Sequence, residues 1–503
     1  MVNAATQLGK RLSRFGRLSL VLLGLGPALL LVRPSPGPAQ DGTNSVTVYT
    51  DTITIPTYAC STSTQLNTQY NISYLRYESC QNFTVDRPYT RLTLENEYLR
   101  LSLLPGLGGR VYELIFKPTG HNEFYRNPVI KGTPWGRPEQ NFGWLAAGGL
   151  EWALPLEEHG YEWGIPWSYT MISNTHGLSV TLRDSDADAD RLRAQITVHL
   201  PADKALFWVN HRLENGRSVP LDFSYWTNAM LAPGAPNAPT GQLRFIVPGN
   251  QIQVHSRDPN DNFLPLEAGL MDWPDGSGRD MSRLGEWSGW FGFFAYPQSQ
   301  ANFAGVYDPS LQEGVMHIFP KAVVTGSKGF GFGWARAIDS YNWTDDGSGY
   351  VELHNGPQPT FWDTTHLAAG ASLAYTGAWY PLAAIGGNMT VNTQFFATEE
   401  AALALTPTAT GVDVGLFSPG QHPHARAVTR RLSDGAILDD RTFDQLDPTA
   451  SQQWSVSTPG LTAEALSLVI FAEDGTVLVA ANPLDDLTEL FPTVWLPLVL
   501  KSQ

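Results

Sequence analysis

The sequence is poor in charged residues and nearly free of cysteine. Charged side chains make up 16% of the 503 residues while aromatic residues reach 11%, and this balance excludes a disordered chain, which would be rich in charge and poor in aromatic residues. Lys and Arg number 32 against 48 Asp and Glu, for a formal net charge of -16. A negative surface repels phosphate backbones, so we expect no nucleic-acid partner and a neutral ligand.

Several sequence signatures of enzyme chemistry are also absent. The chain contains no HExxH, paired CxxC or GxSxG motif, so zinc, nicotinamide and serine-hydrolase chemistry have no support, and we expect no metal and no cofactor. The acidic run DSDADAD (184–190) lacks the glycine and distal glutamate of an EF-hand loop and favours a solvated hairpin. The glycines of GSKGFGFGW (326–334) alternate with Phe, which argues against a phosphate-binding loop.

The N-terminus predicts export. Residues 1–40 combine a basic stretch, an apolar run and a Pro-rich end, typical of a signal peptide or an N-terminal anchor. The remainder is therefore expected to be secreted or on the cell surface, outside the cytoplasm. Cys60 and Cys80 are the only cysteines, and an oxidising compartment favours a disulfide between them, with two buried thiols as the alternative.

The periodicity of the chain predicts an all-β fold. Apolar and polar residues alternate in many short runs, helical periodicity of useful length is missing, and 47 Gly and 36 Pro supply turns between the runs. The clearest of these runs are 45–55, 90–105, 177–184, 192–201 and 205–216. Near residue 400 an Ala- and Thr-rich stretch leads into further strands, which predicts a separate small β-sandwich at 405–488.

A succession of segments resembles a known family. In order they are ENEYLRLSLLPGLGGRVYELIFKPTGHNEFYRNPVIK, AAGGLEWALPLEEHG, DFSYWTNAM, AGVYDP, TGSKGFGFGW and YVELHNGP. Together they resemble an uncharacterised domain-of-unknown-function family of the galactose mutarotase-like (aldose 1-epimerase-like) superfamily, usually found before tetratricopeptide repeats.

The resemblance implies the organisation of the whole chain. A galactose mutarotase-like β-supersandwich, a carbohydrate-handling fold, is expected at 85–395, after an N-terminal β extension at 41–84 that carries both cysteines. The small β-sandwich takes the place of helical repeats. The apolar tail at 489–503 is similar to C-terminal tails of exported proteins, so contact with a membrane or cell surface is expected only through that tail or residues 1–40.

The segment YVELHNGP carries the first candidate site residues. If it is a strand, Val351 and Leu353 share one face and Tyr350, Glu352 and His354 share the other. It resembles the strand of aldose 1-epimerases that bears the general base. Glu352 is therefore predicted to be the base, with Tyr350 and His354 binding substrate, and the alternative is a solvated strand face.

The segment GGLEWALPLEEHG combines carboxylates and aromatic rings, which bind the hydroxyls and the apolar face of a sugar respectively. Glu151, Trp152 and His159 match the family's GG-x-E-W and G-H elements, although here the His precedes the Gly. We predict Glu151 and His159 as catalytic residues and Trp152 as part of the wall. The alternative is an irregular surface loop.

Two further segments add predicted binding residues. Galactose mutarotases have an Asn-His pair where DFSYWTNAM has no His, so the acid would come from His159 or His354, while Tyr225, Trp226 and Asn228 bind the sugar. Asn228 could instead cap a turn. Arg110 also matches a family element and is predicted to bind a hydroxyl, with a purely structural role as the alternative.

Two classes of function follow. In the first, an aldose 1-epimerase, Glu352 removes the proton of the anomeric hydroxyl while His159 or His354 protonates the ring oxygen; a glycoside hydrolase using Glu151 and Glu352 is a variant. The second is a non-catalytic carbohydrate-binding surface protein. Both take a carbohydrate ligand. We expect Glu352, Glu151, His159 and Asn228 to meet in one cleft.

Overall fold

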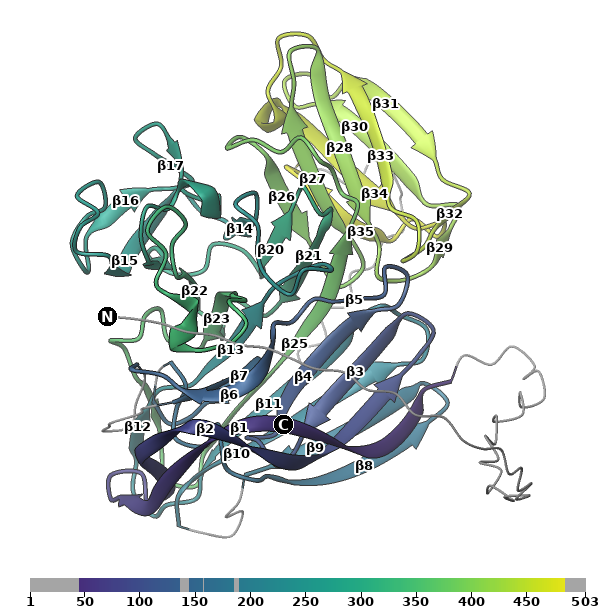
Figure 1. The fold of residues 1–503 in the computed structure, drawn as a ribbon. Helices are drawn as coiled ribbons and strands as arrows, with labels where there is room; N and C mark the ends of the chain where they lie inside the picture. The colour runs from purple at the N-terminus through teal and green to yellow at the C-terminus, as the bar shows by residue number, and fades with distance from the viewer. Residues whose placement is uncertain (1–44, 136–143, 157, 185–189, 485–503) are drawn as a thin grey trace, which may run out of the picture. The chain divides into compact units, whose positions relative to one another are not determined.

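The computed structural model describes residues 45–135, 144–156, 158–184 and 190–484, and the predicted signal at 1–40 and tail at 489–503 lie outside these ranges. The predicted all-β class is confirmed (Figure 1). Helical segments in the described ranges are three short 3-10 turns: η1 (Leu284–Glu286), η2 (Ser340–Asn342) and η3 (Ala463–Ala465). Within the same ranges no helix is long and apolar enough to cross a membrane.

Two large sheets make up the supersandwich. The first has thirteen strands, in the spatial order β16 (Leu270–Asp272), β15 (Gln251–Arg257), β19 (Phe291–Ala295), β22 (Gly326–Gly331), β23 (Val351–Gly356), β13 (Trp226–Leu231), β7 (Leu145–Ala153), β6 (Arg126–Gly132), β1 (Thr47–Asn67), β2 (Ile72–Glu95), β3 (Leu99–Leu104), β4 (Arg110–Phe116) and β5 (His121–Asn122). The second has eight, in the order β14 (Arg244–Ile246), β20 (Phe303–Asp308), β21 (Glu313–Ile318), β25 (Ser372–Ala383), β11 (Phe207–Asn215), β10 (Leu192–Pro201), β9 (Gly177–Arg183) and β8 (Ser168–Asn174).

The main core lies between these two sheets. Strand alternation turns Val351 and Leu353 of β23 into this core, and both side chains are fully buried in one cluster with Val198 and Val209 of the other sheet. Each such burial stabilises the fold by about 1.5–3 kcal/mol. The residues that alternate with Val351 and Leu353 along β23 lie on the opposite face of the thirteen-stranded sheet, away from this core.

Shorter strands complete the fold. Two small pairs are β12 (Leu221–Phe223) with β24 (Thr365–Leu367) and β17 (Asp275–Gly276) with β18 (Arg279–Asp280). The C-terminal strands form one four-stranded sheet of β26 (Gln394–Ala397), β27 (Ala402–Pro407), β28 (Gly411–Phe417) and β33 (Gln452–Ser457), a second of β31 (Ile437–Thr442), β30 (Arg426–Arg431), β34 (Leu466–Phe471) and β35 (Val477–Ala481), and the pair β29 (His422–Pro423) with β32 (Gln445–Leu446).

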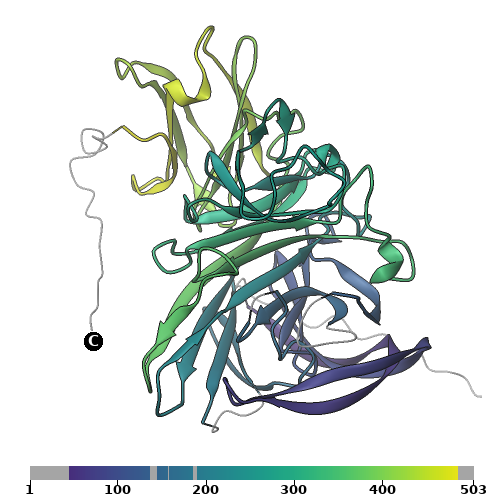
Figure 2. The same cartoon turned by 90° about the vertical axis from the view of Figure 1, so that its left-hand side faces the viewer.

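The C-terminal strands and the β1–β2 hairpin lie at opposite ends in both views (Figures 1 and 2). The C-terminal sheets share a core of their own, and they contact the supersandwich through an ion pair between Lys204 and Glu400 and through the rings of Phe116 and Phe417. β2 runs without a break through the boundary expected at residue 84. The domain boundaries therefore stay a prediction.

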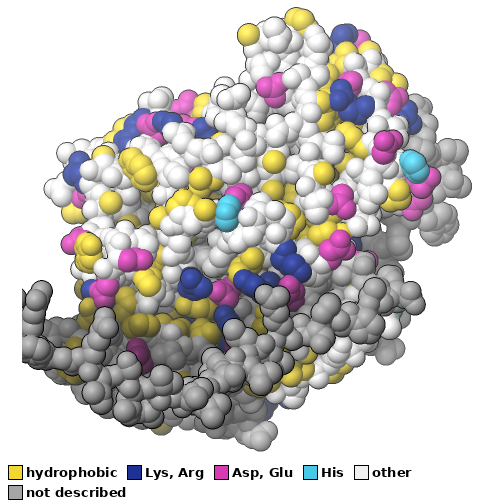
Figure 3. Space-filling model, turned by 45° about the vertical axis from the view of Figure 1, so that its right-hand side comes forward, with side chains coloured by type: hydrophobic (Ala, Val, Ile, Leu, Met, Phe, Trp, Pro, Cys, Tyr) yellow, Lys and Arg dark blue, Asp and Glu magenta, His cyan; other side chains and the backbone are white. Residues whose placement is uncertain are grey.

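The predicted disulfide is confirmed. Cys60 of β1 stands opposite Cys80 of β2 in the antiparallel register, with their Cα atoms 4.0 Å apart, and the two sulfur atoms are bonded. On the face shown in Figure 3, charged side chains of both signs are interspersed with small hydrophobic patches.

Candidate active site

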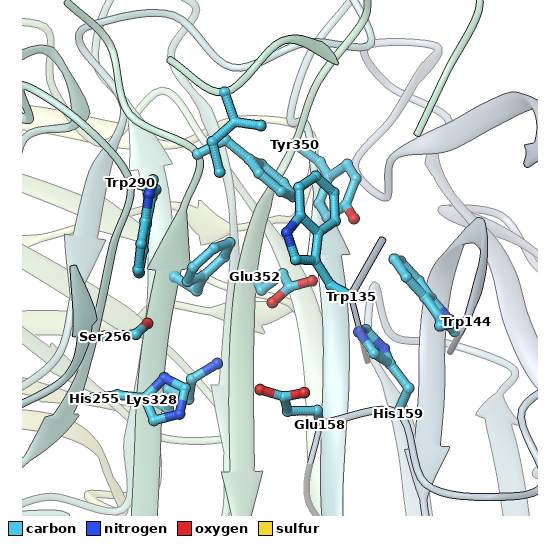
Figure 4. Close-up of a pocket in the computed structure, with 13 residues that line it drawn as sticks. Trp135, Trp144, Glu158, His159, His255, Ser256, Trp290, Lys328, Tyr350 and Glu352 are labelled. Carbon is cyan, nitrogen blue, oxygen red and sulfur yellow. The ribbon is translucent and has the colours of Figure 1, made fainter. Parts of the chain in front are cut away.

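A pocket of about 280 Å³ opens on the thirteen-stranded sheet, on the face turned away from the main core. Its aromatic lining comprises Trp135, Trp144, Trp290, Phe330, Phe332 and Tyr350, and its polar lining comprises Glu158, His159, His255, Ser256, Lys328 and Glu352. Figure 4 shows the Glu352 carboxylate between Lys328 on one side and His159 on the other. Aromatic faces with a few convergent polar groups are the usual composition of a sugar-binding pocket.

Glu352 reaches the pocket by the alternation that the sequence predicted for its strand. Its neighbours Val351 and Leu353 are buried in the core, while Glu352 lines the pocket and is 6% exposed. Burial alone would raise the pKa of Glu352, but the hydrogen bond from His354 and the positive charges of Lys328 and His159 lower it to about 2. Glu352 is therefore ionised across the ordinary pH range.

His354 sits between Glu352 and Lys328, below the pocket lining. Its Nε2 atom lies 3.0 Å from Glu352 Oε2 and 3.2 Å from the Lys328 ammonium nitrogen. Burial, reinforced by the Lys328 charge, lowers the pKa of His354 to about 3, so the ring is neutral. A neutral Nε2 either donates to Glu352 or accepts from Lys328, but cannot do both at once.

Lys328 is a pocket residue that the sequence interpretation missed. β22 pairs with β23 so that Lys328 stands opposite His354 and Phe330 opposite Glu352. The ammonium lies 4.7 Å from the centre of the Phe361 ring, and burial lowers its pKa. Only the pairing of β22 with β23 shows that this lysine belongs with Glu352, because the alternation of glycine and Phe in its own segment points to a strand and nothing more.

His159 faces the same pocket and is held by a buried carboxylate. Its Nδ1–H donates to Glu151 Oε1 at 2.5 Å, which leaves Nε2 for the pocket, and its ring stacks on Trp144 with centroids 3.8 Å apart. Burial lowers the pKa of His159, but the charge and hydrogen bond of Glu151 and the charges of Glu352 and Glu158 outweigh it, so the pKa is raised. His159 therefore tends to carry a proton beside an ionised Glu352.

Glu151 lies behind His159 and does not line the pocket. Its Oε2 accepts from Arg110 Nη2 at 3.1 Å, and its Oε1 accepts from Asn228 Nδ2 at 3.3 Å in addition to His159. Arg110 also donates to backbone oxygens, including that of Gly148. Glu151, Arg110 and Asn228 were predicted as catalytic or binding residues, and none of them is in the pocket lining; they form a buried support that fixes the orientation of His159.

Three of the predicted aromatic binding residues lie outside the pocket. Trp152 follows Glu151 on β7, so alternation turns it into the main core, where its indole N–H donates to the Gly109 carbonyl. Tyr225 is also in that core, with its hydroxyl 2.8 Å from His211 Nδ1. Trp226 shares a strand face with Asn228, but it is buried at the end of its strand against Phe361. Of the predicted aromatic residues, Tyr350 alone lines the pocket.

A β-bulge brings His255 into the pocket. In the pairing of β15 with β19, Val254 faces Phe293 and Ser256 faces Gly292, so His255 is the extra residue, and both it and Ser256 line the pocket. Bulges re-aim side chains in this way, commonly next to active sites. Burial lowers the pKa of His255 to about 2, and its Nδ1 atom has no hydrogen-bond partner among the described residues.

The comparisons with known proteins agree with this fold. Residues 65–367 match the family described as Domain of unknown function (DUF5107), and the chain belongs to this family, which confirms the resemblance inferred from the sequence. A TPR-domain containing protein from Parabacteroides distasonis is similar over 68% of this chain, at 22% identity and a TM-score of 0.56, and the match spans 56% of that protein's length.

Two other solved structures are more distant. The Slr1438 protein from Synechocystis is 15% identical, with 61% of this chain and 100% of that one covered and a TM-score of 0.42. A galactose mutarotase-like protein from Clostridium acetobutylicum is 10% identical, with 59% and 96% covered and a TM-score of 0.40. These similarities concern the fold and assign no activity to this chain.

Proposed function

We propose that this protein is a carbohydrate-active enzyme of the aldose 1-epimerase type, with Glu352 as general base and His159 as general acid. The observation that carries the proposal is the presence of an ionised carboxylate and a carboxylate-supported imidazole in one aromatic pocket. A pocket lined only by aromatic rings and amides would favour binding without turnover.

The proposed reaction opens and recloses a cyclic hemiacetal. Glu352 accepts the proton of the anomeric hydroxyl while His159 donates its Nε2 proton to the ring oxygen, and the bond between the anomeric carbon and that oxygen breaks. Rotation of the resulting aldehyde followed by the reverse transfers gives either anomer. The chemistry requires no redox partner or group carrier.

The charges of the two groups couple the proton transfers. The positive charge of His159 is one reason why the pKa of Glu352 is low, and the negative charge of Glu352 helps to raise the pKa of His159. When His159 gives up its proton, the pKa of Glu352 rises, so the carboxylate becomes a stronger base as the reaction proceeds. The low pKa of Glu352 in the resting pocket is thus compatible with a role as base.

Two of the earlier alternatives are revised by the geometry. His354, considered as the acid, is neutral because its pKa is about 3, and we assign it the role of holding Glu352 in place. Glu151, considered as a glycosidase carboxylate, has its oxygens committed to Arg110, Asn228 and His159. A hydrolase that pairs Glu151 with Glu352 therefore has no support from the pocket.

Export to a secreted or cell-surface location remains part of the proposal. The Cys60–Cys80 disulfide supports it, because such bonds persist in oxidising compartments. Cell fractionation with an antibody against the chain tests the location, and recovery of the protein from the cytoplasm alone would contradict it.

Glu352→Gln tests the mechanism. Polarimetry with freshly dissolved α-glucose or α-galactose measures interconversion of anomers, and titration calorimetry measures sugar binding. We expect turnover to fall at least about 10²-fold with binding nearly unchanged, since the amide keeps the shape and loses the base. Glu214→Gln, a partly exposed carboxylate on β11 of the other sheet, is the matched control.

The outcomes separate the function classes. A wild-type protein that binds sugar without interconverting anomers would be a binding protein, and the epimerase mechanism would be refuted. A wild-type protein that binds none of the sugars would refute the carbohydrate assignment altogether.

A further inference from the structure

A second aromatic position adjoins the pocket on the side of His255. Trp362 is 47% exposed, and its ring centre lies 6.2 Å from that of His255, which lines the pocket. A sugar ring spans a comparable distance, so an indole at this place can meet the unit next to one that is bound over Glu352. Scattered exposed aromatic residues need no explanation, but this one adjoins the polar groups of the pocket.

The turn that carries Trp362 is held in a fixed conformation. The Asp363 carboxylate accepts from the backbone N–H and the hydroxyl of Thr360, at 3.1 and 2.7 Å, and the Thr360 hydroxyl oxygen accepts from the Trp362 backbone N–H at 3.1 Å. The exposed indole is therefore presented by an ordered turn. Presentation of a rigid aromatic face lowers the entropic cost of binding a ligand.

The same turn is anchored beneath the proposed catalytic groups. Phe361, the neighbour of Trp362, is buried with its ring centre 5.5 Å from that of His354 and 5.2 Å from that of His255. Trp362 thus keeps a set position relative to Glu352, because His354 also bonds Glu352. Phe361, packed under the pocket, and the exposed Trp362 are thus consecutive residues of one turn.

His255 supplies a polar group at the junction between pocket and platform. The bulge in β15 aims the ring into the pocket, Gly292 opposite leaves room for it, and its Nδ1 atom has no partner in the described structure. A Cβ atom at position 292 would lie 3.2 Å from that nitrogen. This nitrogen is buried, so a bound glycan contacts the part of the His255 ring that lines the pocket.

We propose that His255 and Trp362 form an outer subsite for a second sugar unit, so that the ligand of the pocket is an oligosaccharide rather than a single monosaccharide. This inference rests on the proposed carbohydrate function and adds the class of ligand. The second pyranose stacks on Trp362, and the first lies over Glu352.

Titration calorimetry with matched sugar pairs tests the subsite. The probes are glucose with cellobiose, galactose with lactose, and mannose with mannobiose, each measured on the wild type, Trp362→Ala and Trp362→Phe. We expect the wild type to bind one disaccharide about tenfold more tightly than its monosaccharide. Trp362→Ala should remove that difference and leave monosaccharide affinity unchanged, while Trp362→Phe should keep most of it.

A matched control and the contrary outcomes make the test decisive. Tyr169→Ala removes another exposed aromatic ring, on the edge strand β8 of the other sheet, and should change neither affinity. Equal binding of monosaccharide and disaccharide by the wild type, or an unchanged difference in Trp362→Ala, would overturn the subsite while the proposed function stands. Binding of none of the six sugars by the wild type would overturn both.

Discussion

The support of His159 by Glu151 makes a sharp prediction for Glu151→Gln. The carboxylate contacts two cations, with His159 Nδ1 at 2.5 Å and Arg110 Nη2 at 3.1 Å, and all three side chains are buried. The amide keeps the size of the side chain and loses its charge. Two effects follow, one on the pKa of His159 and one on the stability of the fold.

The pKa of His159 should fall below its ordinary value of 6.5. Burial lowers the pKa of His159, and Glu151 makes the largest contribution that raises it. When the charge of Glu151 is lost, the effect of burial therefore dominates. Two unit charges about 4 Å apart interact by about 4 kcal/mol at an effective dielectric constant of about 20. Loss of this attraction therefore lowers the pKa of His159.

The fold should also become less stable, because Arg110 is left buried without its charged partner. Breaking such a pair costs about 3–5 kcal/mol. In the wild type the raised pKa of His159 adds stability that is fully present below about pH 6.5 and is lost as pH rises through the raised value. Glu151→Gln should remove this gain in stability toward acid.

Histidine NMR titration and urea unfolding measure the two effects. His159→Gln identifies the His159 signal among the 11 histidines. Asp280→Asn is the control, since it breaks the largely buried pair with Arg244 away from the pocket, and it should lower stability without moving the pKa of His159. A His159 pKa that stays above 6.5 in Glu151→Gln would refute the assigned role of the carboxylate.

Two further predictions concern pH and the disulfide. The rate of anomer interconversion should be level through mildly acidic pH and fall as pH rises through the raised pKa of His159, because the general acid then loses its proton. At low pH the rate should fall only near pH 2, where Glu352 becomes protonated. A rate that rises steadily with pH would contradict the assignment of acid and base. Replacement of both Cys60 and Cys80 by Ser should lower the free energy of unfolding by about 3 kcal/mol, because the bond closes a loop with a sequence separation of 20; equal urea midpoints for variant and wild type would contradict this.

Local patterns were sufficient to predict the all-β class, the strand of Glu352 and the disulfide. Alternation in YVELHNGP placed Glu352 on the face opposite Val351 and Leu353, as the structure has it. The same rule, applied to Glu151 and Trp152, would have shown that adjacent residues of one strand cannot both face the pocket. The alternation rule was not applied to the GG-x-E-W element, so Trp152 was expected beside the sugar, whereas it is buried in the main core.

The remaining site residues depend on features that no local pattern encodes. Lys328 joins Glu352 only because β22 pairs with β23 in a particular register. His255 enters the pocket only because β15 has one extra residue opposite β19. Glu151 lies behind His159 because the chain after β7 returns over that strand, and Gly160 approaches Leu154 too closely for any side chain. Long-range pairing and bulges set these contacts, and the sequence shows neither directly.

The balance of charge around the pocket bears on the kind of sugar it accepts. With His159 protonated, the formal charges of the lining and its support cancel, since three carboxylates (Glu151, Glu158, Glu352) stand against three cations (Arg110, His159, Lys328). Two of the cations, Arg110 and His159, are paired with Glu151, and the third, Lys328, lies beside His354 and Glu352. An anionic sugar would bring a further negative charge toward Glu352 and Glu158, at a cost that the low dielectric of a buried site increases. A neutral sugar adds only hydroxyl groups, which can donate to the carboxylates and accept from the imidazoles. It therefore fits the pocket without disturbing the charges that keep Glu352 ionised and His159 protonated.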